Sequence, residues 1–342
     1  MNTKITDIGT VAPSSPPQEV RNRTLIWRGS ILPKVLPRVA LYTALAILVL
    51  LTHTYTGGSV PFGLFTFTPD LVLGMMLVFR TNTAYDRFWE GRKAWETIVS
   101  ASRNITRQVL ILVVEQTRRD KDEKRQAVKL IPAYAFALKA HLRGQANLTE
   151  LENFLSPDRL HLLAQTPDRP ITLLFWLGDY LRWQYQQQRL SSHQFATLER
   201  GLSQLIDALG VCERILRTPL PFAYSVHLRH ILMLYCVFFP FRLVSQLGWV
   251  TVPVTAIASF VVLGIEEIAL EIENPFGKDA NDLPLAQFCN QIAQDVERLL
   301  SLESGHNLTD VADDVVTQIV RPIKHYREHY PSRRYAYSKQ AL

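Results

Sequence analysis

Charged residues are absent from two long stretches of the chain. Between Val39 and Pro69 there is no Lys, Arg, Asp or Glu over 31 residues, and between Leu243 and Ile265 there is none over 23 residues. A helix needs about 20 apolar residues to cross a bilayer, so the first stretch is long enough for two helices. Gly57-Gly58-Ser59 and Pro61 interrupt it. With the apolar residues that flank both stretches, the pattern predicts four transmembrane helices at about residues 35–55, 61–79, 226–247 and 252–270.

The basic residues predict the orientation of these helices. Residues 1–38 contain six Lys and Arg, residues 80–229 contain 22, and the turns between paired helices contain none. Because cytoplasmic loops are enriched in Lys and Arg, we expect both termini and the central region in the cytoplasm. The first 34 residues lack the apolar core and cleavage site of a signal peptide. The alternative is a soluble helical protein that buries these helices in its core.

The rest of the chain is predicted to be helical and amphipathic, which makes the fold class all-α. Apolar residues recur at helical spacing within residues 80–225 and again within 284–303, where Asp282 is the predicted N-cap. Several prolines between them mark loops. We divide the chain into a disordered N-terminus (1–20), a main domain that contains the four predicted spans (21–305) and a C-terminal tail (306–342), whose last residues from about 330 are also predicted to be disordered.

Composition excludes several classes of function. The net charge of +6 is too small to indicate nucleic-acid binding, and 47% hydrophobic residues exclude disorder over most of the length. The three cysteines lie far apart and form neither a disulfide framework nor a zinc motif. No catalytic or cofactor-binding motif occurs. The pairs His227/His230 and Glu267/Glu271 lack further ligands, so we predict no enzyme, no catalytic residue and no metal site.

Three segments at the predicted membrane boundaries carry a family resemblance. They run from Phe79 to Trp95 (FRTNTAYDRFWEGRKAW), from Thr218 to Tyr224 (TPLPFAY) and from Ile272 to Pro284 (IENPFGKDANDLP). In this order and at these positions they resemble the bestrophin family of ion channels, and the first string is similar to its prokaryotic and plastid branch. The resemblance covers residues 22–305.

The resemblance implies a homopentamer around one central pore. In the family the second helix lines a narrow apolar neck with residues at i, i+4 and i+8, and the matching positions here are Leu64, Thr68 and Val72. Thr68 departs from the usual apolar or aromatic residue. Leu220 matches the second constriction, at the cytosolic exit. The alternative is that these residues pack between helices or, for Leu220, belong to an ordinary loop.

Asp70 stands inside the second predicted span, where a carboxylate is costly and suggests a function. It lies two residues from Thr68 and from Val72, which is ~200° of helical rotation. If those residues face the pore, Asp70 faces neighbouring helices or caps the helix after Pro69. We favour this structural role over ion binding.

The segment after the fourth span corresponds to the calcium clasp of animal bestrophins. There, acidic side chains and backbone carbonyls bind the ion. Here Lys278, Ala280 and Asn281 replace acidic residues. We therefore predict no calcium gating and no cofactor, and a plain turn is the alternative role. The degenerate clasp positions are Glu271, Asn274, Lys278, Asp279, Asn281 and Asp282.

The predicted function is passive conduction of monovalent anions such as chloride through an apolar neck. An apolar neck suits weakly hydrated anions, and the cytoplasmic excess of Lys and Arg raises the local anion concentration. A monovalent cation channel (Na⁺ or K⁺) of the same architecture is the alternative, and a non-conducting membrane scaffold is less favoured. The expected partners are further copies of the chain, membrane lipids and monovalent ions. The expected location is the cell (inner) membrane, or the thylakoid if the source is cyanobacterial.

Overall fold

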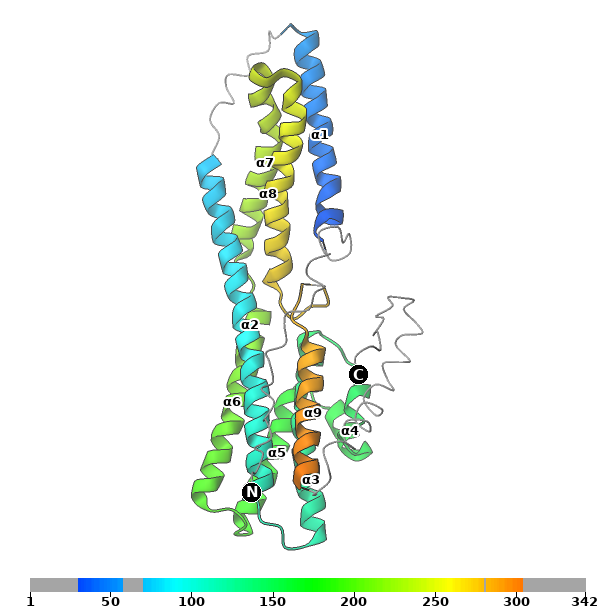
Figure 1. Cartoon of the computed structure of the whole chain (residues 1–342), viewed down its shortest axis with the longest axis vertical. Helices are drawn as coiled ribbons and strands as arrows, with labels where there is room; N and C mark the ends of the chain where they lie inside the picture. Colours follow the sequence, from blue (N-terminus) through cyan, green and yellow to red (C-terminus); the bar gives the residue numbers. More distant parts are fainter. Residues whose placement is uncertain (1–29, 58–69, 280, 304–342) are drawn as a thin grey trace, which may run out of the picture. The chain divides into compact units, whose positions relative to one another are not determined.

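A computed structural model describes residues 30–57, 70–279 and 281–303 (Figure 1). These residues form helices and turns without a strand, which confirms the all-α prediction for the described part of the chain. The helices are α1 (Leu32–Tyr55), α2 (Asp70–Leu112), α3 (Arg118–Leu142), α4 (Pro157–Ala164), α5 (Arg169–Gln186), α6 (Ser192–Arg217), α7 (Phe222–Leu247), α8 (Thr251–Glu273) and α9 (Leu285–Glu303), with 3₁₀ turns at Thr149–Leu151 and Gly248–Val250.

The chain divides into two compact units. Unit 1 comprises residues 1–73 and 229–268, and unit 2 comprises residues 74–228 and 269–342. Each of α2, α7 and α8 is one continuous helix that contributes residues to both units. The predicted domain limits at residues 21 and 305 lie outside the described residues, as do the predicted disordered N-terminus (1–20) and the C-terminal tail (306–342).

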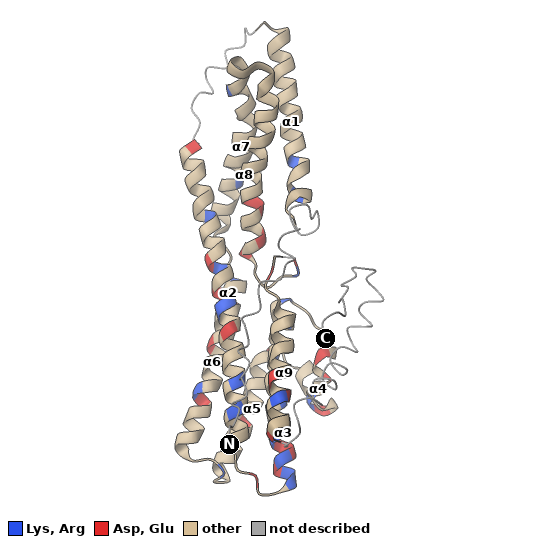
Figure 2. Cartoon of the chain, in the orientation of Figure 1, with Lys and Arg blue, Asp and Glu red and all other residues tan. Residues whose placement is uncertain are grey.

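Unit 1 contains α1 and most residues of α7 and α8, the apolar helices in which three of the predicted membrane spans lie. Leu32–Tyr55 and Phe222–Glu273 are long and apolar enough to do so, and only 28% of each apolar window is buried. A core helix of a soluble protein would be mostly buried, so this exposure argues against the soluble alternative. Gly248, with φ +53°, separates α7 from α8 at the short turn. Figure 2 shows few charged residues along α1, α7 and α8.

The predicted spans coincide with described helices at three places. Residues 35–55 lie in α1, 226–247 in α7 and 252–270 in α8, and each helix extends slightly beyond its predicted span. Of the second predicted span (61–79), residues 61–69 lie outside the described part of the chain. The described part of α2 does not end at residue 79 but continues to Leu112, 43 residues in all.

Unit 2 is built around α3. Helices α5 and α9 pack against α3, and α6 packs against α5. Alanines 133, 135 and 137 of α3 are buried, and their small side chains allow close approach of the neighbouring helices. Tyr134 is fully buried and donates its hydroxyl hydrogen to the Leu205 carbonyl at 2.9 Å. The buried hydroxyl of Tyr134 therefore has a hydrogen-bond partner, and it joins α3 to α6 inside the core of this unit.

Local sequence signals explain where several helices of unit 2 begin. Thr117 with Asp120 forms a capping box at α3, and Ser191 with Gln194 forms one at α6. Pro157 and Pro170 lie in the first turns of α4 and α5, where proline fits because its missing N–H would have no helical partner. These prolines thus begin helices directly after the loops that they were predicted to mark.

The prediction that Asp282 caps the last helix is wrong. One oxygen of its carboxylate accepts the N–H of Asp279 at 2.6 Å, and α9 begins only at Leu285, after Pro284. The acidic residue therefore closes the preceding turn. Asp282 lies only three residues before Leu285, so the sequence pattern alone did not distinguish an N-cap of α9 from a residue of the preceding turn.

Candidate functional site

The first turns of α2 expose a continuous set of apolar side chains. Leu71 is 79% exposed, Met75 52% and Phe79 59%. They are spaced at i, i+4 and i+8, which places them on one helical face. Val72, the one predicted neck residue within the described part of the chain, is exposed too. Leu64 and Thr68 lie outside it. An apolar face this exposed on a single chain needs lipid, a second subunit or a dewetted pore beside it.

Two arginines of α2 form hydrogen bonds with the end of α6, the start of α7 and the end of α8. Arg80 is almost fully buried; it donates to a carboxylate oxygen of Glu273 at 3.0 Å and to the Ser225 hydroxyl at 2.9 Å. Seven residues further, Arg87 donates to the backbone carbonyl of Glu273 at 3.2 Å. Its other nitrogens donate to the carbonyls of Ile215 and Thr218, at the end of α6.

These contacts satisfy backbone groups that helices leave without partners. The last carbonyls of a helix carry partial negative charge and have no intrahelical donor. Arg87 supplies that donor at the end of α6 and at the end of α8. The Arg80–Glu273 pair stabilises the same region because a buried arginine needs a charged partner. We call Arg80, Arg87 and Glu273 the junction.

Leu220, the predicted cytosolic constriction, is held by the junction. Its backbone N–H donates to Glu273 Oε1 at 3.2 Å, and its side chain is half-buried. Four residues later, the Tyr224 hydroxyl donates to the Met76 carbonyl of α2 at 2.9 Å. The loop between α6 and α7 is therefore bonded to α8 at Leu220, and the first turn of α7, directly after the loop, is bonded to α2.

The turn between α8 and α9 is anchored through its backbone. Phe276 is fully buried, and its carbonyl accepts from Arg143 Nε at 3.2 Å. A Cβ atom at Gly91 of α2 would approach the Phe276 ring to 3.2 Å, so glycine at this position lets the ring pack closely against α2. The Leu283 N–H donates to the Pro275 carbonyl at 2.9 Å and closes the turn.

The acidic groups of this turn are engaged by the protein itself. A Glu271 oxygen accepts from the Asn281 amide at 2.6 Å, and a Cβ atom at Gly277 would lie 2.6 Å from Asp282 Oδ2. Burial raises the pKa of Asp282, although the Asp279 N–H and the Arg143 charge act against that rise. Asn274, Lys278 and Asp279 are exposed. The described residues contain no cluster of three His, Cys, Asp or Glu side chains able to hold a metal ion.

Asp70 begins the described part of α2 and forms an ion pair with α7. Its Oδ2 atom lies 2.9 Å from Nη1 of Arg242, and both residues belong to unit 1. This contact agrees with the prediction that Asp70 faces a neighbouring helix. Arg242 was not among the residues predicted from the sequence, although it is the charge that directly precedes the second uncharged stretch. The junction was missed as well.

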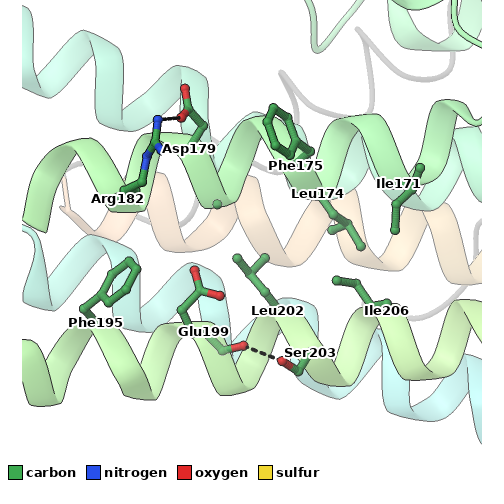
Figure 3. Close-up of a pocket in the computed structure, with 11 residues that line it drawn as sticks. Ile171, Leu174, Phe175, Asp179, Arg182, Phe195, Glu199, Leu202, Ser203 and Ile206 are labelled. Atoms are coloured by element: carbon green, nitrogen blue, oxygen red, sulfur yellow. Dashed lines mark hydrogen bonds and ion pairs between the residues drawn. The ribbon is translucent and has the colours of Figure 1, made fainter.

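A groove of about 480 Å³ between α5 and α6 was not predicted from the sequence (Figure 3). Phe175 and Phe195 line it together with Glu199, whose pKa is raised by burial. An ion pair of 2.8 Å between Arg182 and Asp179 lies along it. None of the predicted site residues lines this groove.

Comparison with known proteins decides the family. A model of the family described as bacterial and fungal bestrophin proteins matches residues 11–298. The chain belongs to the bestrophin family. The resemblance seen in the three boundary segments is thereby confirmed, and it extends over most of the chain.

Two curated relatives carry names that describe a function. This bestrophin is 44% identical over 289 residues to a voltage-dependent anion channel-forming protein of Nostoc sp. (strain PCC 7120), covering 84% of this chain and 93% of the relative. It is 40% identical over 298 residues to a protein of the same name from Synechocystis sp. (strain PCC 6803), covering 87% and 97%.

A solved structure shows the same fold. A crystal structure of a bacterial bestrophin homologue from Klebsiella pneumoniae matches with a TM-score of 0.70 and 28% sequence identity, over 80% of this chain and 99% of that one. Other matching crystal structures are described as those of a membrane protein, for example one with a TM-score of 0.71 that covers 78% of this chain and 98% of that one. This bestrophin is therefore a helical membrane protein, and its family is one of ion channels.

Proposed function

We propose that this bestrophin assembles as a homopentamer and conducts monovalent anions such as chloride passively through a central pore. The observation that carries the proposal is the 44% identity, over 84% of the chain, to a protein named as an anion channel-forming protein. The exposed apolar face of α2 supports it, because a pore helix requires a face that a single chain leaves uncovered.

We assign the neck of the pore to this face of α2. The register predicted from the sequence contains Leu64, Thr68 and Val72. Four and eight residues after Val72, the same face carries Met76, which is half-buried, and Arg80, which is buried in the junction. The neighbouring register, Leu71, Met75 and Phe79, stays exposed at every step. The neck therefore includes this second register at its inner end. Rings of such side chains gate by dewetting and favour weakly hydrated anions.

In a cyclic assembly, the same face of α2 from every subunit lines the central axis. A head-to-tail interface closes into a ring when each subunit is rotated by a fixed angle, and every copy then presents the same face to the axis. Five copies of α2 would surround the neck, and five copies of Leu220 would form the cytosolic constriction. The junction sets the position of Leu220 through the bond from its N–H to Glu273.

The proposed topology places four helices in the cell (inner) membrane with both termini in the cytoplasm. The thylakoid membrane is the alternative location if the source is cyanobacterial. The region between the second and third spans then lies in the cytoplasm, where its Lys and Arg residues concentrate anions near the inner mouth. The turn between α8 and α9 acts as a structural connection without calcium, because its carboxylates already accept bonds from Asn281 and Asp279.

Flux from liposomes tests the proposal. Purified protein in chloride-loaded vesicles is expected to release chloride, and Phe79→Ala is expected to raise the rate several-fold because it removes bulk from the neck. Phe175→Ala is the matched control, since Phe175 is also an exposed phenylalanine (70%, against 59% for Phe79) but lies on α5, and the rate of this variant should equal that of the wild type. Protein that releases no chloride would support a non-conducting scaffold, and release of K⁺ in its place would support the cation alternative.

A further inference from the structure

Unit 1 contains two separate layers of charge. In the first layer, Glu267 lies 3.9 Å from Lys34 and 3.6 Å from Arg38, and Glu266 lies 3.6 Å from Arg229. Both glutamates are buried, whereas the three basic side chains are each about half exposed. This arrangement of basic residues around apolar helices is typical of the cytoplasmic edge of a membrane domain.

The second layer is the ion pair between Asp70 and Arg242. Arg242 follows Arg229 on α7 by 13 residues, which corresponds to about 20 Å along the helix axis. No Asp, Glu, Lys or Arg stands between them on α7. Since the hydrocarbon core of a bilayer is about 30 Å thick, the pair lies within the outer part of the membrane-spanning region if the first layer marks its inner edge.

Charges at this depth are expensive, and their pairing has a consequence for permeation. An isolated carboxylate or guanidinium within a membrane-spanning helix costs several kcal/mol, and such residues usually line a water-filled path or pair with each other. Here the side chains remain 47% (Asp70) and 33% (Arg242) exposed, so part of each charged side chain lies on the surface of the single chain. A lone aspartate on the pore helix α2 would repel anions and attract cations. Arg242 cancels that field.

We infer that the Asp70–Arg242 pair determines the charge selectivity of the pore, with Arg242 as the residue that keeps the outer end of α2 permissive to anions. The inference rests on the proposed function, because it requires α2 to line the conduction path. It adds a specificity-determining pair that neither the sequence resemblance nor the neck residues identify.

Reversal potentials of single and double variants test this inference. In planar bilayers under a KCl gradient, Arg242→Gln removes the positive charge beside Asp70 and should lower the ratio of chloride to potassium permeability roughly twofold or more. Asp70→Asn removes the negative charge beside Arg242 and should raise that ratio by a similar factor. A unit charge at about 8 Å in water changes the local ion concentration by this amount. The double variant should return to the wild-type ratio, and Arg242→Lys should retain it.

Two controls separate an electrostatic role from a structural one. Glu123→Gln removes an exposed ion pair on α3 and should leave the reversal potential unchanged. Lower ionic strength should enlarge the shifts of the single variants, since screening weakens. Wild-type current combined with unmoved reversal potentials in both single variants overturns the inference alone. Shifts of equal sign in both variants overturn it too. Absence of any wild-type current overturns the proposed function and the inference together.

Discussion

Glu273 makes three hydrogen bonds around the proposed exit. Its two carboxylate oxygens accept from Arg80 and from the Leu220 N–H, and its backbone carbonyl accepts from Arg87. One side chain therefore links the buried arginine of the pore helix to the loop that carries the predicted constriction. Its substitution should affect both stability and conduction.

Glu273→Gln should lower the free energy of unfolding by about 3 kcal/mol, because removing one partner leaves Arg80 as a buried, unpaired charge. Denaturant titration in detergent micelles measures this loss. Glu123→Gln is the control, since its exposed pair with Arg119 on α3 should contribute at most about 0.5 kcal/mol. Equal effects of the two substitutions would contradict the role assigned to the junction.

Sequence reasoning reached some residues of the site and missed others for a physical reason. Asp70 was identified because a carboxylate interrupts a predicted membrane span, and Leu220 was identified through the family resemblance of the segment around it. Arg80 and Glu273 are 193 positions apart, and Asp70 and Arg242 are 172 apart. A pair of that separation forms only through the tertiary fold, so no local pattern reveals it.

At the scale of elements, the apolar and amphipathic periodicities predicted the helices well, and the capping boxes explain several of their starts. What the periodicity did not give is the register of the neck. The predicted register follows from counting back from Arg80 in a family pattern, whereas exposure on α2 depends on which face other helices cover. Leu71, Met75 and Phe79 became candidates only once their exposure was known.

The turn between α8 and α9 supports a test with calcium. Glu271 and Asp282 are engaged by Asn281 and by the Asp279 N–H, and Lys278 adds a positive charge to the same turn. We therefore expect the same thermal unfolding midpoint in millimolar calcium as in the same concentration of magnesium. A rise specific to calcium, abolished in Asp282→Asn, would show that the clasp binds the ion.

At the scale of the whole molecule, the account depends on what covers the exposed apolar surfaces of a single chain. The helices of unit 1 are too exposed for the core of a soluble protein, and the match to bestrophin structures explains this by a membrane environment. The proposed pentamer explains the exposed face of α2. The sequence indicated the family, since its three boundary segments are short and specific; the contacts of the junction and of Asp70 required the structure.

The reversal potential of the purified wild-type protein in a planar bilayer under a tenfold KCl gradient tests the central claim most directly. The account predicts a potential near the equilibrium value of chloride, because an apolar neck formed by five copies of α2, with the charge of Asp70 neutralised by Arg242, favours monovalent anions. A potential near the equilibrium value of potassium, or a bilayer that stays silent at every voltage, would contradict it.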